Sequence, residues 1–221
     1  MADAVDLRAA GPILDAMVRA VVDNAAMLNQ LDGAIGDGDH GVNMSKGFRR
    51  AAQKLDAAPQ GLGEGFGVLA ETLLDEIGGS MGPLYGSFFL DMSTFLRGRA
   101  TLDRDGFAAM LRAGVAAVVD LGDGKPGDKS LVDVLAPSLD AFAAATGRGE
   151  SFPACLDALD AAADAGLEAT RDLKARIGRA SRLGERSRGH LDAGAASCTL
   201  LLHALAQGLR AQLRRTEGEV K

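Results

Sequence analysis

The spacing of the apolar residues limits the fold of this chain more than any other feature of its sequence. Steps of three and four residues separate Ile13, Met17, Val21, Ala25 and Leu28. This spacing puts one apolar stripe along a single long N-terminal helix. Alternating β-branched runs are missing and aromatic residues make up only 4% of the chain, so the signals for β-strands are weak. The sequence therefore predicts an all-α fold.

Similar patterns predict further helices along the rest of the chain. A second helix is expected to begin near Asn43 or Ser45, which are both cap-type residues. Ser151, followed by a proline two residues later, marks another helix start. The remaining helices are expected over residues 62–77, 84–97, 104–120, 131–145, 153–175 and 195–214. Because no linker or repeat interrupts the pattern, we expect one domain over residues 1–221, an antiparallel bundle or barrel of eight helices.

Composition excludes several classes of protein. The formal net charge is -6, and an acidic excess without a basic stripe argues against binding to nucleic acid or to an anionic membrane. No apolar run approaches the roughly 18 residues of a membrane span, and the acidic N-terminus differs from a signal peptide, so we expect a cytoplasmic protein. Cys155 and Cys198 are the only cysteines and form no C-x-x-C pair. We interpret them as reduced core residues.

Four stretches that combine glycine with polar residues lie between predicted helices. They are GDGDHGVN (36–43), GGSMGPLYG (78–86), GDGKPGDKS (122–130) and GERSRGHLDAG (184–194). Alternate loops of an up-and-down bundle gather at one end, where helix N-termini offer free N–H groups that suit phosphate. Glycines that simply end helices are the alternative. The occurrence of four such stretches favours a shared site.

The first of these stretches, with the residues just before it, places Asp32, Asp37 and Asp39 within eight positions. Two carboxylates about 4 Å apart repel each other by ~1 kcal/mol in water and ~4 kcal/mol at an effective dielectric constant of 20. A divalent cation would relieve this repulsion, but the loop does not have the residues of an EF-hand: counted from Asp37, Val42 and Phe48 replace the required Gly and Glu. Mg²⁺ fits a short acidic loop beside phosphate-binding glycines. Alternatively, Asp32 caps the exit of the first helix and the other two form Asx turns.

Charge also bears on the number of metal ions and on the kind of phosphate site. With a nucleoside diphosphate of charge about -3, three aspartates bring the total to about -6, and two Mg²⁺ reduce it to about -2. Gly122 and Gly127 have the separation of the P-loop glycines, but Asp128 occupies the lysine position and Lys129 is one residue late. The charge balance therefore favours two magnesium ions. The position of Asp128 and Lys129 leads us to reject a P-loop. A di-metal oxidase is excluded because its Glu-x-x-His pairs are missing.

Several of these segments together resemble a known family. IGDGDHGVNMSKGF, GGSMGPLYG, PGDKSLVDVLAP and GRASRLGERSRGHLDAGAAS are similar, in this order, to motifs of the L subunits of bacterial dihydroxyacetone kinases. The match runs from about residue 10 to the C-terminus. The resemblance implies an eight-helix barrel that binds ADP or ATP with two Mg²⁺ at one end.

The resemblance also implies which residues form the site. Asp32, Asp37 and Asp39 match the magnesium ligands. The residues that match nucleotide-binding positions are His40, Gly41, Val42, Asn43, Ser80, Met81, Gly122, Leu131, Arg179, Leu191, Asp192 and Ala193. Met81 stands where the family usually has a hydroxyl residue, and Ala193 where it usually has proline. Leu131 replaces a common methionine near the adenine.

Phosphoryl transfer is the activity that the resemblance implies, and it needs positioning and charge neutralisation rather than covalent catalysis. In the resembled systems a separate K subunit holds dihydroxyacetone, and ADP stays bound while a phosphohistidine of an M subunit of the phosphotransferase system recharges it. A free-standing chain of this length favours that type. One alternative is an ATP-exchanging kinase subunit for another short-chain ketose. Another is a non-catalytic, nucleotide-sensing adaptor that binds a transcriptional regulator through the same site.

Overall fold

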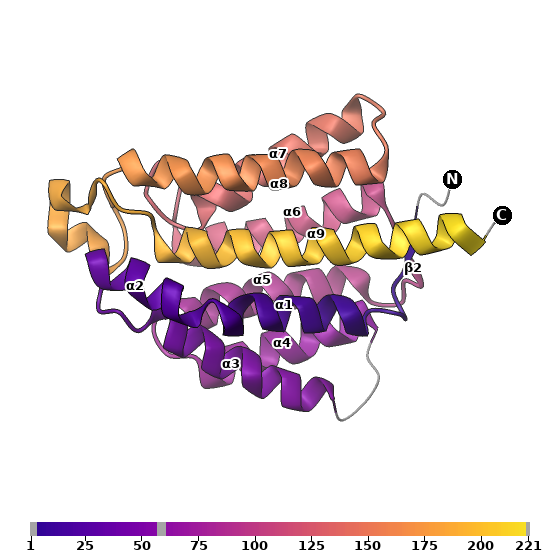
Figure 1. Cartoon of the computed structure of the whole chain (residues 1–221), viewed down its shortest axis with the longest axis horizontal. Helices are drawn as coiled ribbons and strands as arrows, with labels where there is room; N and C mark the ends of the chain where they lie inside the picture. The colour runs from indigo at the N-terminus through magenta and orange to yellow at the C-terminus, as the bar shows by residue number, and fades with distance from the viewer. Residues whose placement is uncertain (1–3, 57–60, 220–221) are drawn as a thin grey trace.

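Eight helices form a closed ring in the computed structural model, which describes residues 4–56 and 61–219 (Figure 1). Each helix of the ring packs on the next one, and the last packs on the first. In chain order they are α1 (Gly11–Asp23), α3 (His40–Leu55), α4 (Leu62–Glu76), α5 (Met81–Leu96), α6 (Arg104–Gly122), α7 (Val132–Gly147), α8 (Phe152–Ala169) and α9 (Ala193–Glu219). The predicted all-α, eight-helix barrel is confirmed.

The prediction of one long N-terminal helix is wrong, because the structure has two helices over these residues. α1 ends at Asp23, and α2 (Ala25–Ile35) lies outside the ring, against α3 and α9. Between them the Asn24 side chain donates a hydrogen bond to the carbonyl of Ala20 (2.8 Å). Such side-chain bonds compete with the helical pattern, and neither glycine nor proline marks the break in the sequence. α2 therefore extends the barrel at one end only.

The other predicted helix bounds differ from the structure mainly at their ends. Helices α4, α6 and α7 begin and end within two residues of the expected positions, and the Ser151 side chain caps α8 as predicted. α5 begins three residues earlier than expected. α8 ends at Ala169 instead of residue 175, and the short 3₁₀ segments η1 (Thr170–Asp172) and η2 (Arg179–Ser187) follow it.

The helices alternate in direction around the ring (Figure 1). The N-termini of α3, α5, α7 and α9 consequently lie at the same end, drawn at the left, together with α2 and η2. At the opposite end the three-residue strands β1 (Ala4–Asp6) and β2 (Thr101–Asp103) pair in antiparallel fashion, with Val5 opposite Leu102. The sequence did not predict this small sheet, which lies at the end of the barrel opposite to the N-termini of α3, α5, α7 and α9.

Aromatic side chains fill the interior of the ring. Phe107 packs on Phe142 with ring centroids 4.7 Å apart, and Phe66 packs on Phe89 at 5.5 Å. Both cysteines are free and buried, as expected for reduced core residues. In the described part of the chain, no helix has the length and apolar character needed to cross a bilayer. Burial of these large side chains is the main favourable contribution to the stability of the barrel.

Candidate functional site

A cavity of about 940 Å³ opens at the end of the ring where four helix N-termini meet. All four glycine-containing stretches identified in the sequence contribute to its lining. The N-terminal turns of α3, α5, α7 and α9 border it, so backbone N–H groups that have no partner within their helices converge on one space. Their partial positive charges favour an anionic ligand there.

Most of the residues predicted from the sequence line this cavity. They are Asp32, Asp37, Asp39, His40, Asn43, Ser80, Met81, Gly122, Leu131, Arg179, Asp192 and Ala193. The structure does not place Gly41, Val42 or Leu191 in the lining. Gly41 instead lets α3 approach α2, because a Cβ there would lie 1.9 Å from the carbonyl oxygen of Ala25. The Val42 side chain is exposed, and its N–H donates to Asn29 Oδ1 (3.0 Å).

Asp32 links α2 to the beginning of α3. Its Oδ2 accepts hydrogen bonds from the backbone N–H groups of Gly38 (2.8 Å), Asp39 (3.0 Å) and His40 (3.4 Å). The side chain thus caps the following helix rather than the exit of its own, and α3 begins at His40 instead of at Asn43 or Ser45. At Gly36 a Cβ would lie 2.2 Å from Asp32 Oδ1, so the second carboxylate oxygen needs a glycine beside it.

The three aspartates of this loop form a compact carboxylate cluster. One oxygen from each of Asp32, Asp37 and Asp39 lies within 4.8 Å of the other two. A cation already faces the cluster, because Arg179 of η2 forms an ion pair with Asp37 and its Nη1 lies 3.9 Å from Asp39 Oδ1. The side chains of Asp37 and Asp39 are about half exposed. Hard oxygen ligands this close together fit Mg²⁺, with positions left for water and phosphate oxygens.

His40 is held in a buried hydrogen-bonded chain that joins three helices. Its Nε2 lies 2.9 Å from Ser197 Oγ, which is 2.7 Å from the hydroxyl of Tyr85. The Tyr85 hydroxyl also donates to the carbonyl of Gly194 (3.2 Å). Burial lowers the pKa of His40 to about 4, and the nearby Asp32 carboxylate opposes this shift. His40 is therefore neutral at pH 7 and fixes the first turn of α3 against those of α5 and α9.

Asp192 caps α9 at the opposite wall of the cavity. Its Oδ2 accepts a hydrogen bond from the N–H of Ala195 (2.7 Å), and the helix begins at Ala193. Burial raises the pKa of Asp192 to about 6, against the lowering effects of that hydrogen bond and of the Lys129 charge. Ala193 is the first residue of α9, a position where proline is also common, so the alanine and the proline that the family usually has there are both compatible with the helix start.

Several lining residues were not predicted from the sequence. The apolar ones, among them Leu84, Leu121 and Ile177, join Leu131 to give part of the cavity an apolar wall suited to a planar base. Lys129 was considered only as an argument against a P-loop, and Arg182 was not singled out. Lys129 is only 2% exposed. The sequence did not indicate that Lys129 is buried, because lysines are rarely buried unless they are paired.

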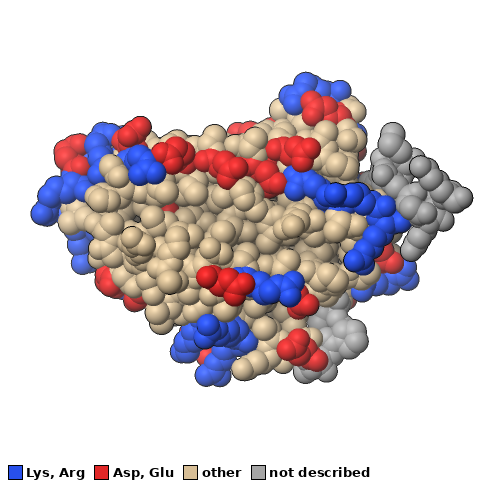
Figure 2. Space-filling model, in the orientation of Figure 1, with Lys and Arg blue, Asp and Glu red and all other residues tan. Residues whose placement is uncertain are grey.

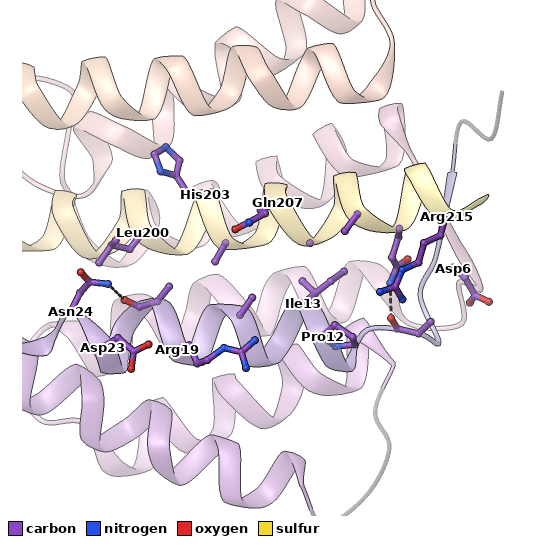
Figure 3. Close-up of a pocket in the computed structure, with 17 residues that line it drawn as sticks. Asp6, Pro12, Ile13, Arg19, Asp23, Asn24, Leu200, His203, Gln207 and Arg215 are labelled. Carbon is purple, nitrogen blue, oxygen red and sulfur yellow. Dashed lines mark hydrogen bonds between the residues drawn. The ribbon is translucent and has the colours of Figure 1, made fainter. Parts of the chain in front are cut away.

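Figure 3 shows a second cavity of about 650 Å³, which lies between α1 and α9. Small and aliphatic side chains such as Ile13 and Leu200 line it, with Arg19, Asp23 and His203 among its polar residues. None of the residues predicted from the sequence contributes to its described lining. Figure 2 shows mostly uncharged atoms in the middle of this face, while Lys and Arg gather toward both its left and its right ends.

Comparison with known proteins gives matches over most of the chain. The DAK2 domain family matches residues 34–207. The ADP-binding subunit DhaL of PEP-dependent dihydroxyacetone kinase 1 from Listeria innocua is 39% identical over 188 residues, which are 85% of this chain and 89% of that protein. L-Erythrulose 1-kinase from Mycolicibacterium smegmatis is 36% identical over 200 residues, which are 89% of this chain but 35% of the relative. The crystal structure of the C. freundii dihydroxyacetone kinase in complex with AMP-PNP and Mg²⁺ is similar with a TM-score of 0.67 at 28% identity, covering 88% of this chain and 33% of that one.

Proposed function

The chain belongs to the DAK2 domain family, and we propose that it is the nucleotide-binding subunit of a kinase for dihydroxyacetone or a related short-chain ketose. One observation carries this proposal: four helix N-termini and three clustered carboxylates face the same cavity. The Listeria innocua relative is an ADP-binding subunit, and the C. freundii structure holds AMP-PNP and Mg²⁺. Such a cavity has both parts that a magnesium–nucleotide complex requires.

Asp32, Asp37 and Asp39 would hold magnesium in this proposal. Asp32 would contribute Oδ1, because Oδ2 already accepts three backbone hydrogen bonds. Two ions are favoured by charge, since a diphosphate and three carboxylates carry about -6 before metal binding. When bound, Mg²⁺ neutralises the phosphate oxygens and the charge that develops during phosphoryl transfer.

The remaining residues of the cavity would position the nucleotide. The N-terminal turns of α3, α5 and α9 direct N–H groups at the phosphates, and Arg179 supplies a permanent charge with planar donors at the same corner. Leu131, Leu84 and Ile177 would receive the base at the apolar wall. Neutral His40 is tied to Ser197 and so acts as a support rather than a general base. Positioning and electrostatic stabilisation are what this reaction needs most.

Two partner proteins follow from the proposed reaction. The ketose would be bound by a separate substrate-binding K subunit, which receives the γ-phosphate across an interface at the open end of the cavity. A phosphohistidine protein, the M subunit, would recharge the bound ADP, as the PEP dependence of the Listeria innocua relative suggests. The match to an L-erythrulose 1-kinase favours a four-carbon ketose as the second candidate substrate.

A nucleotide-exchange experiment tests this proposal. The purified chain is denatured and the released nucleotide identified, and a second sample is mixed with Mg²⁺ and labelled ATP to follow exchange. Bound ADP with exchange slower than turnover of the assembled kinase supports a coenzyme that is recharged in place. Rapid exchange would contradict recharging in place, and failure to bind either nucleotide in the presence of Mg²⁺ would overturn the nucleotide-binding role.

A further inference from the structure

One long segment of the chain outside the barrel forms part of the cavity wall. The chain leaves the barrel at Thr170, after α8, and returns at His190, just before α9. Residues 171–189, here called the arginine loop, include η2 and lie at the left end of the molecule in Figure 1. The loop contributes Ile177, Gly178 and Arg179 to the cavity. The position of this loop therefore determines where the Arg179 guanidinium lies.

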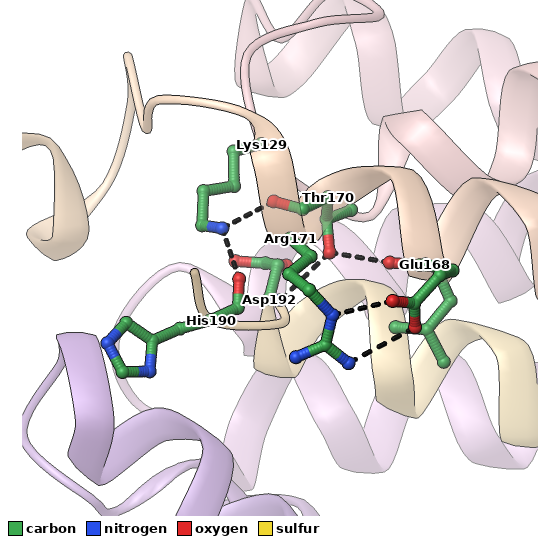
Figure 4. Close-up of polar contacts among 7 residues, drawn as sticks. Lys129, Glu168, Thr170, Arg171, His190 and Asp192 are labelled. Atoms are coloured by element: carbon green, nitrogen blue, oxygen red, sulfur yellow. Dashed lines mark hydrogen bonds and ion pairs between the residues drawn. The ribbon is translucent and has the colours of Figure 1, made fainter. Parts of the chain in front are cut away.

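Lys129 lies at the base of this loop, where both of its ends leave the barrel (Figure 4). Its Nζ donates a hydrogen bond to the carbonyl of Thr170 (2.5 Å) and another to the carbonyl of His190. These carbonyls belong to the residues that immediately precede and follow the arginine loop. A single buried ammonium thus joins the two ends of an excursion of about 20 residues.

Lys129 adopts a backbone conformation that few lysines adopt. Its φ is 65°, in the left-handed region, where a side chain other than that of glycine, asparagine or aspartate is uncommon. Asp133 stabilises this turn, because its two carboxylate oxygens accept hydrogen bonds from Gly127 N–H (2.5 Å) and Ser130 N–H (2.7 Å). The turn thus directs the Lys129 side chain from the start of α7 to the base of the arginine loop.

The space between the carbonyls of Thr170 and His190 suits a positively charged donor as well as a long side chain. Two carbonyls that face one buried point would repel each other without a donor between them, and a charged donor forms the stronger hydrogen bonds. Burial lowers the pKa of Lys129, while the carboxylates of Asp192, Asp133 and Asp172 raise it and Arg171 lowers it further. Asp192 caps α9, so the Lys129 ammonium is also coupled to the helix N-terminus beside the cavity.

Weaker contacts close the same base. Gly189 N–H donates to the carbonyl of Arg171 (2.8 Å), and Asp192 N–H donates to Thr170 Oγ1 (3.1 Å). Arg176 N–H also donates to the carbonyl of Asp128 (3.0 Å), which joins the middle of the arginine loop to the turn that contains Lys129. These bonds from neutral N–H donors each contribute less than a charged donor shared by two carbonyls.

We propose that Lys129 is a positioning residue that clasps the base of the arginine loop and thereby fixes Arg179 and the N-terminus of α9 at the cavity. The part of this inference that concerns nucleotide affinity rests on the proposed function. The clasp itself is a property of the unliganded chain. Lys129 is not a phosphate ligand here, because its ammonium donates to two main-chain carbonyls.

The test compares Lys129→Met, which keeps the apolar stem but removes the ammonium, with Lys125→Met in the same turn. Lys125 is exposed and lies outside the cavity lining, which makes it a matched control. Amide hydrogen exchange of the arginine loop is measured without nucleotide, and Mg·ADP affinity by titration calorimetry. We expect Lys129→Met to speed exchange in residues 171–189 and to weaken Mg·ADP binding, each by about 10- to 100-fold, as for other residues that support a site without touching the ligand. Lys125→Met is expected to change neither.

Unchanged exchange in the arginine loop of Lys129→Met would overturn the clasp. An increase spread evenly over all helices of the barrel would also overturn it, because that is the result of general destabilisation. The two proposals fail separately: if the wild-type chain binds no Mg·ADP, the proposed function is wrong, while the exchange experiment still decides the clasp.

A second variant keeps the test valid if Lys129→Met does not fold. Lys129→Gly suits the left-handed backbone and leaves space beside the cavity for a small amine. We expect n-butylamine, which is protonated at neutral pH, to restore slow exchange in the arginine loop, whereas n-butanol of the same length does not. Equal rescue by both compounds would show that no charge is required, and no rescue by the amine would show that an ammonium at this point does not order the loop. Either result would overturn the proposal.

Discussion

Two loops that share the pattern Gly-Asp-Gly-x-x-Gly take opposite electrostatic roles in this protein. Residues 36–43 and residues 122–130 both begin Gly-Asp-Gly, and each stretch connects two helices at the cavity end of the barrel, the first running into α3 and the second starting at the last residue of α6. In each, a carboxylate from an adjacent helix accepts hydrogen bonds from backbone N–H groups of the loop: Asp32 in the first and Asp133 in the second. The first loop leaves two carboxylates half exposed toward the cavity, while the second buries a lysine.

The difference shows that a glycine–aspartate loop is not by itself a metal site. Whether such a loop can bind a metal depends on which charged side chains remain without a partner once the backbone N–H groups of the loop are hydrogen-bonded. Asp37 and Asp39 face the half-exposed guanidinium of Arg179 at the cavity, whereas Lys129 is buried and donates to carbonyls of its own chain. Each loop also fixes a buried basic side chain, neutral His40 in one and Lys129 in the other. Four measurements separate these roles.

The largest expected effect concerns the titration of His40. Its pKa is lowered by burial to about 4 in the folded chain, against 6.5 in the unfolded chain, so the unfolded state binds more protons between these values. The contribution of His40 to the free energy of unfolding is therefore at its full value above pH 6.5. It decreases by about 3 kcal/mol as the pH drops to 4. Urea unfolding of the wild type and His40→Gln at pH 7 and pH 4 measures the change, since the opposing contribution of Asp192 is common to both. A pH-independent difference between them would contradict the buried neutral state.

The next effect tests the exposed carboxylates of the first loop. Asp37→Asn should weaken Mg-dependent ADP binding at least about 100-fold, or about 2.7 kcal/mol, because a neutral amide is a poor magnesium ligand. Helicity measured by circular dichroism should stay the same. Asp123→Asn, an exposed residue with φ of 51° in the second loop, is the control, since asparagine tolerates that conformation. Equal ADP affinity in the wild type and Asp37→Asn would remove the magnesium role of this loop.

A smaller effect is expected from the carboxylate that holds the second loop. Asp133→Asn should lower the free energy of unfolding by about 2 kcal/mol, because one backbone N–H loses its acceptor and the other loses a charged one. Urea denaturation measures this loss, with the exposed Asp140→Asn on the same helix as control. If the two variants were equally stable, Asp133 would not be what orders the turn around Lys129.

The smallest effect concerns the backbone of the second loop. Gly127 has φ of 95° and open space around its Cα, so Gly127→Ala is strained only by its conformation. We expect a loss of about 1 kcal/mol in unfolding free energy with ADP affinity unchanged. Gly147→Ala, in open space with ordinary φ, should not be destabilising. Weakened ADP binding by Gly127→Ala would mean that the middle of the second loop, and not only its ends, contributes to the nucleotide site.

Local signals in the sequence predicted some elements better than others. The Ser151 cap was found because the capping residue and the capped N–H lie three residues apart. The start of α3 was missed because its cap, Asp32, is eight residues before the helix and sits inside α2. The break at Asn24 was missed because no glycine or proline marks it. Lys129 was missed because its two acceptors lie 41 and 61 residues away in the chain.

The sequence by itself determined the helical class, the alternation of helices with glycine-containing loops and the residue types that gather around the cavity, because helical periodicity and loop chemistry are local properties. Only the tertiary structure decided that α2 stands outside the ring, that Asp32 shares its two oxygens between a helix cap and the cavity, and that one loop exposes its charges while the other buries a cation. These outcomes depend on hydrogen bonds and desolvation between segments far apart in the chain, which no local pattern encodes.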